Sequence, residues 1–278
     1  LVLREDHSAP TFSFDAIFLG GLRFEAATNN GISKFVSNMQ TRGTSTMDHQ
    51  QIAEELESMA ASITGFSGVR SLSFSGRGLR DDRERVVQIF LELLLDSTYP
   101  EDQIELVRSL VLDGIKRQQD KPSHVMMRQF KQALYGDHPV GMNSAGTTES
   151  VQNITRNDLV AFAERVFQPA NLVFTMVGDF ETDAVIDQLA AGMGSWQGTS
   201  EFTEPTLAAP IFPEEAQLHY QADDKMQSNI VLGFPAITMD HPDKFPMIVA
   251  NKILSGASGR LFQELRDKQS LAYSVSGS

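Results

Sequence analysis

The sequence has no cysteine, which excludes disulfides, thiolate zinc sites, iron–sulfur clusters and a cysteine nucleophile. It also has no apolar run long enough to span a membrane. Basic residues are few: 23 lysines and arginines stand against 36 aspartates and glutamates, for a net charge of −13. Nucleic acid and anionic membranes are therefore poor partners, and we expect a soluble protein without membrane insertion. A cysteine-free chain suits either redox environment, so the compartment, cytoplasmic or periplasmic, stays open.

Short catalytic signatures are missing as well. The six histidines include no HxxxH or HxxEH pair, so no helix can present two imidazoles to zinc. No P-loop, dinucleotide-binding fingerprint or nucleophile elbow is present. The sequence therefore offers no common motif for nucleotide binding or serine-hydrolase chemistry.

The patterns that are present indicate an α+β fold. Residues 11–19 alternate apolar with mostly polar side chains, which predicts a strand. Asp48 and Gln51 form a capping-box pattern at a helix start. Further strands are predicted at 62–69, 70–78 and 172–177, and helices at 30–42, 48–61, 81–96, 100–119, 123–135, 155–167 and 181–192. We expect an antiparallel or mixed sheet faced by helices.

Length and composition predict two domains in 278 residues. Residues 1–194 form the first, and residues 195–213, rich in proline and small polar residues, form an extended linker. Residues 214–278 begin a second domain. Its strands are predicted at 215–221, 228–234 and 270–276, and its helices at 243–255 and 259–267. Because the first residue is not Met and the last predicted strand has no terminal cap, we expect a sequence truncated at both ends, with the second domain incomplete.

The helix predicted at 30–42 carries an unusual polar stripe. Lys34, Ser37 and Asn38 fall at the i, i+3 and i+4 positions where a helix would present two metal ligands and a base. An ammonium, a hydroxyl and an amide do not hold zinc. From the residues alone, this stripe is an ordinary solvated face.

A glycine interrupts the helix predicted at 100–119. Gly114 lies beside the apolar stripe that we expect to be buried, where glycine costs about 1 kcal/mol relative to alanine. The stripe consists of Ile104, Val107, Leu110, Val111 and Ile115. Such a glycine marks either close packing or a position that has lost its side chain.

Near the end of the sequence, Arg266 closes a predicted helix and Tyr273 lies on the strand that follows a short turn. This spacing can bring a guanidinium and a phenol to one surface, where both can donate to a carbonyl oxygen. The alternative is structural, because an arginine near a helix C-terminus is favoured by the helix dipole.

The run LFQELRDKQSLAYSV resembles the second-domain signature of the pitrilysin/insulinase-type zinc metallopeptidases, the inverted HxxEH class. The resemblance extends over roughly residues 10–278. It includes the segments 31–44, 120–123, 138–141 and 177–179. It implies a repeated processing-peptidase-like (LuxS-like) domain, in which Arg266 and Tyr273 bind the substrate backbone near the scissile carbonyl.

The sequence departs from this family at the zinc site. The resemblance places Lys34 and Asn38 at the two zinc histidines, Ser37 at the catalytic glutamate, and Gly114 at or beside the distal glutamate ligand. All ligands and the base are therefore replaced, which explains both unusual helices as one vacated site. No catalytic residue and no metal is expected in this chain alone.

The family pairs such zinc-free halves with zinc-bearing halves around a closed chamber for unfolded peptides. The resemblance thus implies a non-catalytic subunit or half of a zinc metalloendopeptidase, with zinc in an HxxEH-bearing partner and an unfolded peptide as substrate. The alternative is a protease-derived structural or peptide-binding scaffold with no proteolytic role. Retention of Arg266 and Tyr273 favours the first reading, because a scaffold does not need that pair.

Overall fold

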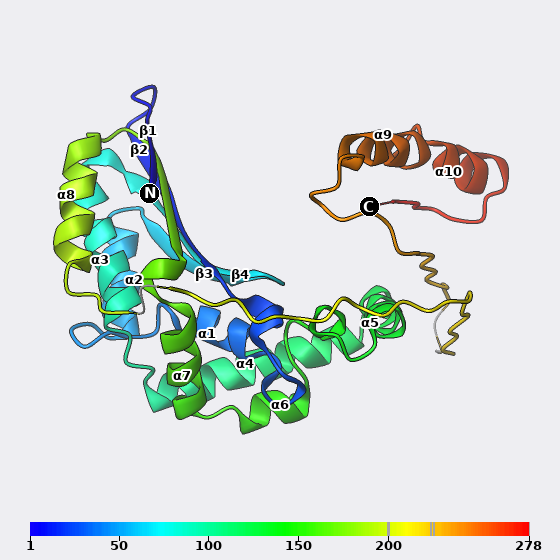
Figure 1. The fold of residues 1–278 in the computed structure, drawn as a ribbon, viewed down its shortest axis with the longest axis horizontal. Coiled ribbons are helices and arrows are strands. Elements are labelled where there is room, and N and C mark those ends of the chain that lie inside the picture. The colour runs from blue at the N-terminus through cyan, green and yellow to red at the C-terminus, as the bar shows by residue number, and fades with distance from the viewer. Residues whose placement is uncertain (199–200, 223, 225, 278) are drawn as a thin grey trace. The chain divides into compact units, whose positions relative to one another are not determined.

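A computed structural model describes residues 1–198, 201–222, 224 and 226–277 (Figure 1). The chain divides into two compact units, Leu1–Val231 and Leu232–Ser278. The first unit holds the sheet and most of the helices, and the second holds α9 and α10. No helix in the described part of the chain is long and apolar enough to cross a membrane.

The first unit is built on a five-stranded mixed sheet with the strand order β1-β5-β2-β4-β3. The strands are β1 (Val2–Glu5), β2 (Thr11–Leu19), β3 (Ser62–Ser67), β4 (Ser71–Leu79) and β5 (Leu172–Gly178). Only β1 and β5 run parallel, and the other neighbours are antiparallel. The expected α+β class with a mixed sheet faced by helices is confirmed.

The helices of the first unit are α1 (Ile32–Met39), α2 (His49–Ser58), α3 (Arg83–Leu95), α4 (Glu101–Gln119), α5 (Pro122–Tyr135), α6 (Thr148–Asn153), α7 (Arg156–Val166) and α8 (Thr182–Met193). The capping box at Asp48 is confirmed, because its carboxylate accepts from the Gln51 backbone N–H at 2.8 Å. Figure 1 shows α3 and α8 on one side of the sheet. Most of these helices were predicted from the sequence, but α6 and the four-residue strand β1 were not.

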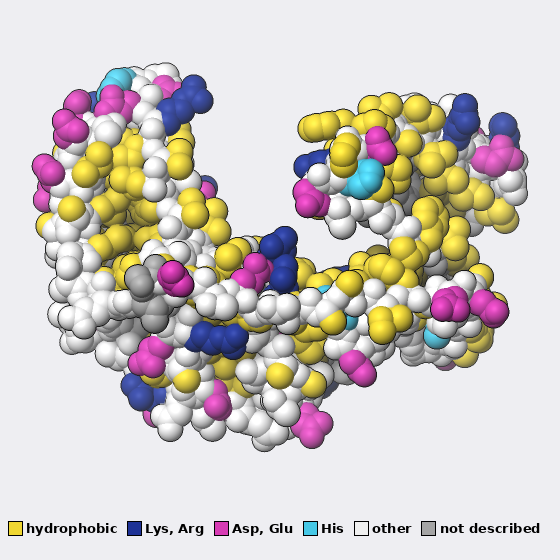
Figure 2. All heavy atoms as spheres, in the orientation of Figure 1, with side chains coloured by type: hydrophobic (Ala, Val, Ile, Leu, Met, Phe, Trp, Pro, Cys, Tyr) yellow, Lys and Arg dark blue, Asp and Glu magenta, His cyan; other side chains and the backbone are white. Residues whose placement is uncertain are grey.

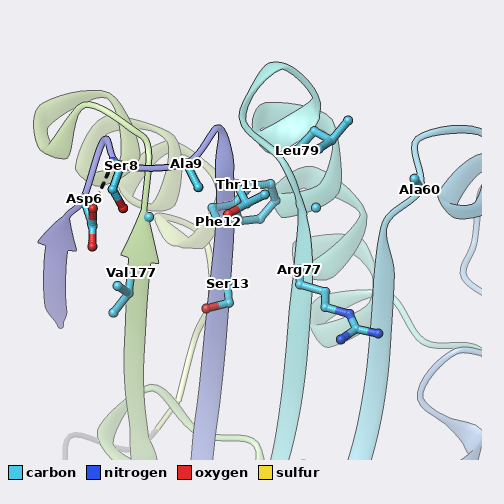
Figure 3. A pocket seen from close by; sticks show the side chains of 12 residues that line it. Asp6, Ser8, Ala9, Thr11, Phe12, Ser13, Ala60, Arg77, Leu79 and Val177 are labelled. Atoms are coloured by element: carbon cyan, nitrogen blue, oxygen red, sulfur yellow. Dashed lines mark hydrogen bonds between the residues drawn. The ribbon is translucent and has the colours of Figure 1, made fainter.

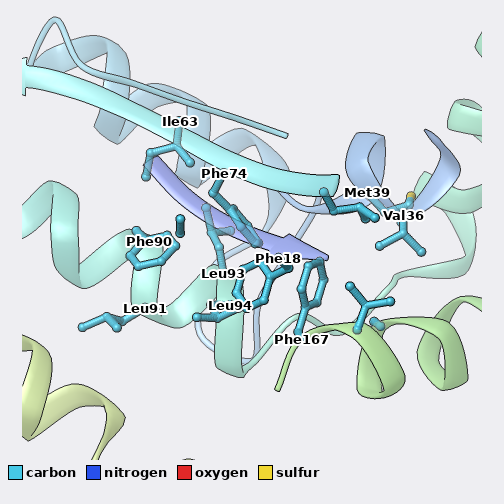
Figure 4. Close-up of a cluster of buried hydrophobic side chains, with 14 of the residues drawn as sticks. Phe18, Val36, Met39, Ile63, Phe74, Phe90, Leu91, Leu93, Leu94 and Phe167 are labelled. Atoms are coloured by element: carbon cyan, nitrogen blue, oxygen red, sulfur yellow. The ribbon is translucent and has the colours of Figure 1, made fainter. Parts of the chain in front are cut away.

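The core lies between the sheet and the helices. Side chains of β2 alternate strictly between buried and exposed, with Phe14 and Phe18 on the buried face. The Phe14 ring meets Phe90 of α3 at a centroid distance of 4.9 Å. The Phe18 ring meets Phe167, the residue after α7, at the same distance (Figure 4). Val36 and Met39 of α1 belong to the same cluster. Because α1 contributes to this core, its orientation is fixed by packing.

The strands predicted at 215–221, 228–234 and 270–276 are wrong: these described segments form no strand. Their alternating pattern is real, since Ile230, Leu232 and Phe234 recur at every second position. These three side chains are 87%, 88% and 73% exposed. A strand needs a hydrogen-bonded neighbour, and none of the described residues pairs with them. Pattern alone therefore could not create these strands.

The segment predicted as a linker, residues 195–213, has neither helix nor strand in its described part. It is nevertheless fastened within the first unit. The Phe202 ring stacks on Phe24 at 5.8 Å, and the Glu204 carboxylate lies 3.1 Å from the Arg23 guanidinium. The segment is thus extended, as its prolines suggest, but packed against the unit that precedes it.

The second unit contains α9 (Lys244–Leu254) and α10 (Arg260–Phe262), which continues as a π-helical stretch, Gln263–Lys268. These match the helices predicted at 243–255 and 259–267. Figure 2 shows hydrophobic side chains gathered over α9, where Phe245, Val249 and Ile253 are more than half exposed.

Candidate functional site

Helix α1 lies tightly against strand β3. A Cβ at Gly65 would collide with the backbone carbonyl oxygen of Ser37 and with the Gln40 side chain. Only glycine allows the helix to approach the strand so closely. This contact sets how close Lys34, Ser37 and Asn38 of α1 lie to the sheet.

A buried carboxylate fixes the start of α1. Glu25 is 6% exposed, and its two oxygens accept from the backbone N–H groups of Gly31 at 2.7 Å and Ser33 at 3.0 Å, and from the Asn30 side-chain amide at 2.8 Å. Gly31 has φ of 96°, a conformation that favours glycine. Glu25 therefore caps the free donors at the positive end of the helix dipole. The capping role of Glu25 was not predicted from the sequence, because Glu25 lies outside the usual N-cap position.

The polar stripe of α1 is less solvated than the sequence suggested. Ser37 is buried, 3% exposed, and its hydroxyl donates to the backbone carbonyl of Lys34 at 2.8 Å. Lys34 and Asn38 are half-buried. The expectation of a plain solvated face is wrong for Ser37, because β3 covers this side of the helix.

Gly114 lies on α4, which packs against α1. A Cβ at Gly114 would meet only the guanidinium of Arg117, with its Nη2 atom 4.0 Å away. Close packing therefore does not explain this glycine, and a Cβ fits at this position. Leu110, predicted to be buried in the same helix, is 49% exposed, so the buried stripe is narrower than expected.

The residues at these four positions do not suit zinc. Lys34 offers a cation, Ser37 a hydroxyl already engaged with backbone, Asn38 a neutral amide and Gly114 no side chain. Among the described residues, no three His, Cys, Asp or Glu side chains are grouped to hold a metal ion. The assignment of these positions as a vacated zinc site stays a prediction from the resemblance.

The structure brings Arg266 and Tyr273 together. The guanidinium carbon of Arg266 lies 5.0 Å from the centre of the Tyr273 ring and 4.6 Å from that of Phe262. Arg266 is half-buried, whereas Tyr273 is 84% exposed. The neighbouring acid, Glu264, is engaged with Lys268 at 2.8 Å. Within the described chain no carboxylate lies within ion-pair distance of Arg266, so its guanidinium keeps its charge available.

A separate hollow of about 480 Å³ lies at one end of the sheet, under the β1–β2 loop (Figure 3). Hydroxyls and apolar groups line it, together with Arg77 and Asp6, whose carboxylate accepts from the Ser8 N–H at 3.0 Å. None of the residues selected from the sequence is among the described residues that line it. Its single acid is engaged with backbone, so it offers no catalytic acid–base pair.

Close by, His7 and Asp179 form the tightest ionisable contact of this region, with 2.6 Å between imidazole Nδ1 and carboxylate Oδ1. The hydrogen bond to Asp179 raises the pKa of His7, and the bond from His7, aided by the nearby charge of Arg80, lowers the pKa of Asp179. Arg80 binds the other carboxylate oxygen at 2.9 Å. Both carboxylate oxygens of Asp179 thus have a partner. The cluster links the loop after β1 to the residue that follows β5.

Residues 1–148 match the family model described as Insulinase (Peptidase family M16), and residues 153–278 match the model described as Peptidase M16 inactive domain. The first match alone covers more than half of the chain. This chain belongs to the insulinase family. The resemblance to the family is thereby confirmed, and so is the expected succession of an N-terminal and a C-terminal domain of the peptidase type.

Members of the insulinase family similar to this chain include proteins described as uncharacterized zinc proteases. YmxG of Bacillus subtilis is 27% identical over 256 residues, covering 92% of this chain and 61% of that protein. A Mycobacterium leprae protein is 29% identical over 260 residues, covering 92% and 58%. This chain therefore spans about 60% of the length of these curated relatives.

Solved structures share the fold. A peptidase M16 inactive domain from Pseudomonas fluorescens has a TM-score of 0.80 at 24% identity, covering 98% of this chain and 66% of that chain. A protease from Helicobacter pylori has the same TM-score at 18% identity, covering 98% and 67%.

Proposed function

We propose that this chain is the zinc-free half of a metalloendopeptidase, which binds unfolded peptide and completes the active site of a zinc-bearing partner. Membership of the insulinase family supports a peptidase context. The relatives are described as zinc proteases, whereas the donor set of Lys34, Ser37, Asn38 and Gly114 does not suit zinc. Alone, this half holds no zinc and cleaves no peptide.

The observation that carries the proposal is the contact between Arg266 and Tyr273. The guanidinium of Arg266, which has no carboxylate partner among the described residues, lies over the ring of the exposed Tyr273, within one compact unit. Both groups are hydrogen-bond donors, and neither the phenol nor the guanidinium donates to an acceptor among the described residues. A pair of free donors at an exposed surface suits an acceptor that comes from outside, such as a peptide carbonyl.

These donors would act on the carbonyl at which the peptide is cleaved. In the tetrahedral intermediate of peptide hydrolysis this oxygen gains negative charge, so a fixed guanidinium and phenol stabilise it more than the ground state. The guanidinium of Arg266 lies over the rings of both Phe262 and Tyr273, and these contacts limit its motion before the peptide binds. The partner's zinc supplies the metal chemistry, and this half supplies binding and charge stabilisation.

We expect the purified chain to retain no stoichiometric zinc after dialysis. The variant Lys34→His/Asn38→His should bind zinc weakly, because only two ligands are restored. Adding Gly114→Glu should tighten binding by at least about tenfold, since protein zinc sites use three or more ligands and a Cβ at position 114 meets no close neighbour. Zinc content and competition with a chromophoric chelator measure both quantities.

A third ligand on the wrong face provides the matched control. Gln119 is exposed on the same helix, so Gln119→Glu, which also adds one carboxylate to the double variant, should leave zinc affinity unchanged. Tight zinc in the unmodified chain would contradict the proposal. Equal affinities of the variants with Gly114→Glu and Gln119→Glu would show that position 114 is not part of the site.

The partner can be tested directly. We expect a tagged form of this chain to co-purify from its native source with a chain that contains an HxxEH motif. Adding this chain to the separated partner should raise its rate of peptide hydrolysis, while neither half alone shows the full rate. Co-purification without any HxxEH chain, with no peptidase activity in the complex, would favour the scaffold reading instead.

A further inference from the structure

A second hollow of the first unit, about 390 Å³ in volume, lies beside α5. One wall is the face of α5 that carries His124, Arg128 and Lys131, and the opposite wall is the loop 141–144. Gln118, near the end of α4, closes one side. The volume is within the range of ligand pockets.

The charge of this hollow differs from that of the whole chain. His124, Arg128 and Lys131 are spaced by four and three residues, so they project from one face of α5. Ten described residues line the hollow, and none of these is acidic. Within the described chain, no carboxylate lies within ion-pair distance of these three side chains. In a protein with a net charge of −13, the two cations Arg128 and Lys131 on one helix face favour an anionic ligand.

The opposite wall is neutral, polar and held in place. The Asn143 side chain accepts from the backbone N–H of Ala145 at 3.1 Å, and its carbonyl accepts from the Asn30 side chain at 2.9 Å. Asn30 in turn donates to Glu25, the cap of α1. The loop is therefore tied to the same buried network that orients α1. A fixed neutral wall that faces Arg128 and Lys131 can admit a carboxylate without repelling it.

The hollow also lies close to the vacated position on α4. Gln118 follows Gly114 by four residues, so the two share a helix face about 6 Å apart along the axis. An extended peptide that passes over Gly114 can therefore reach the cations of α5 within a few residues.

We propose that the hollow beside α5 binds the side-chain carboxylates of an acidic segment in the peptide substrate. This inference rests on the proposed function, because it takes a peptide as the ligand. Arg128 and Lys131 lie one helical turn apart, which matches two acidic side chains on one extended strand better than a single small anion. Met127, also on this face, adds an apolar surface for the stem of a glutamate side chain.

The test is peptide binding to the full chain, without any partner. A fluorescently labelled peptide with several glutamates should bind at least about fivefold more tightly than its counterpart with glutamines, and salt should reduce the difference. Arg128→Gln/Lys131→Gln should abolish the preference. The control Arg4→Gln/Lys116→Gln removes the same charge from exposed residues that do not line the hollow, and should keep it.

A charge reversal gives a second readout. Arg128→Glu/Lys131→Glu should reverse the preference, so that a lysine-containing peptide binds more tightly than the glutamate peptide. Equal binding of the glutamate and glutamine peptides to the unmodified chain, or equal losses in the two double variants, would overturn the proposal. A hollow that binds inorganic phosphate at millimolar concentration but does not discriminate between the two peptides would also overturn it. Because no partner is present, a failure of partner stimulation leaves this result unaffected.

Discussion

Glu25→Ala is expected to lower the free energy of unfolding by about 2–4 kcal/mol. The substitution leaves three donors without their acceptor: the N–H groups of Gly31 and Ser33 and the amide of Asn30. Each charge-assisted bond in a buried site contributes more than an exposed one, and a helix cap alone contributes about 1 kcal/mol. Urea unfolding followed by circular dichroism measures the change.

Two companion variants separate the cap from a general loss of charge. Glu25→Gln keeps one acceptor oxygen and should cost less than the alanine variant. Glu57→Ala removes an exposed glutamate near the end of α2 and should change stability by under about 0.5 kcal/mol. Equal effects of Glu25→Ala and Glu57→Ala would mean that the carboxylate does not hold α1 in place.

Local patterns predicted the elements whose signals lie within a few residues. The alternation of residues 11–19 gave β2, and Asp48 with Gln51 gave the start of α2. The predicted strands at 228–234 and 270–276 have the same kind of pattern but no paired neighbour. A helix closes its hydrogen bonds within itself, whereas a strand depends on a distant segment, so strand predictions failed where helix predictions held.

The residues of the candidate site also differ in whether nearby sequence alone determines their positions. The spacing of Arg266 and Tyr273 across one turn allowed their proximity to be foreseen, and the structure places the guanidinium over the ring. Glu25 could not be foreseen, because its role depends on how the preceding chain folds back onto α1. The hollow beside α5 combines that helix with a loop ten or more residues further on, and sequence spacing does not reveal such a wall.

Removal of Arg266 is expected to weaken catalysis by the proposed pair of halves. Arg266→Ala should lower the turnover of the pair of halves by about 10²–10³-fold, while changing its stability by under about 1 kcal/mol. The loss should appear in kcat more than in KM, because the charge on the carbonyl oxygen develops mainly in the transition state. Arg260→Ala, an exposed arginine on α10, is the matched control and should leave turnover unchanged.

Tyr273→Phe isolates the hydroxyl, because phenylalanine keeps the ring that lies 5.0 Å from the guanidinium carbon of Arg266. We expect about a tenfold loss of turnover, less than for Arg266→Ala, since the guanidinium keeps its charge when only the phenol is lost. If Arg266 merely stabilises the end of its helix, the outcome differs: the melting temperature of Arg266→Ala falls, and both variants keep the turnover of the unmodified pair. Turnover and melting temperature measured on the same preparations therefore distinguish a donor aimed at substrate from a structural arginine.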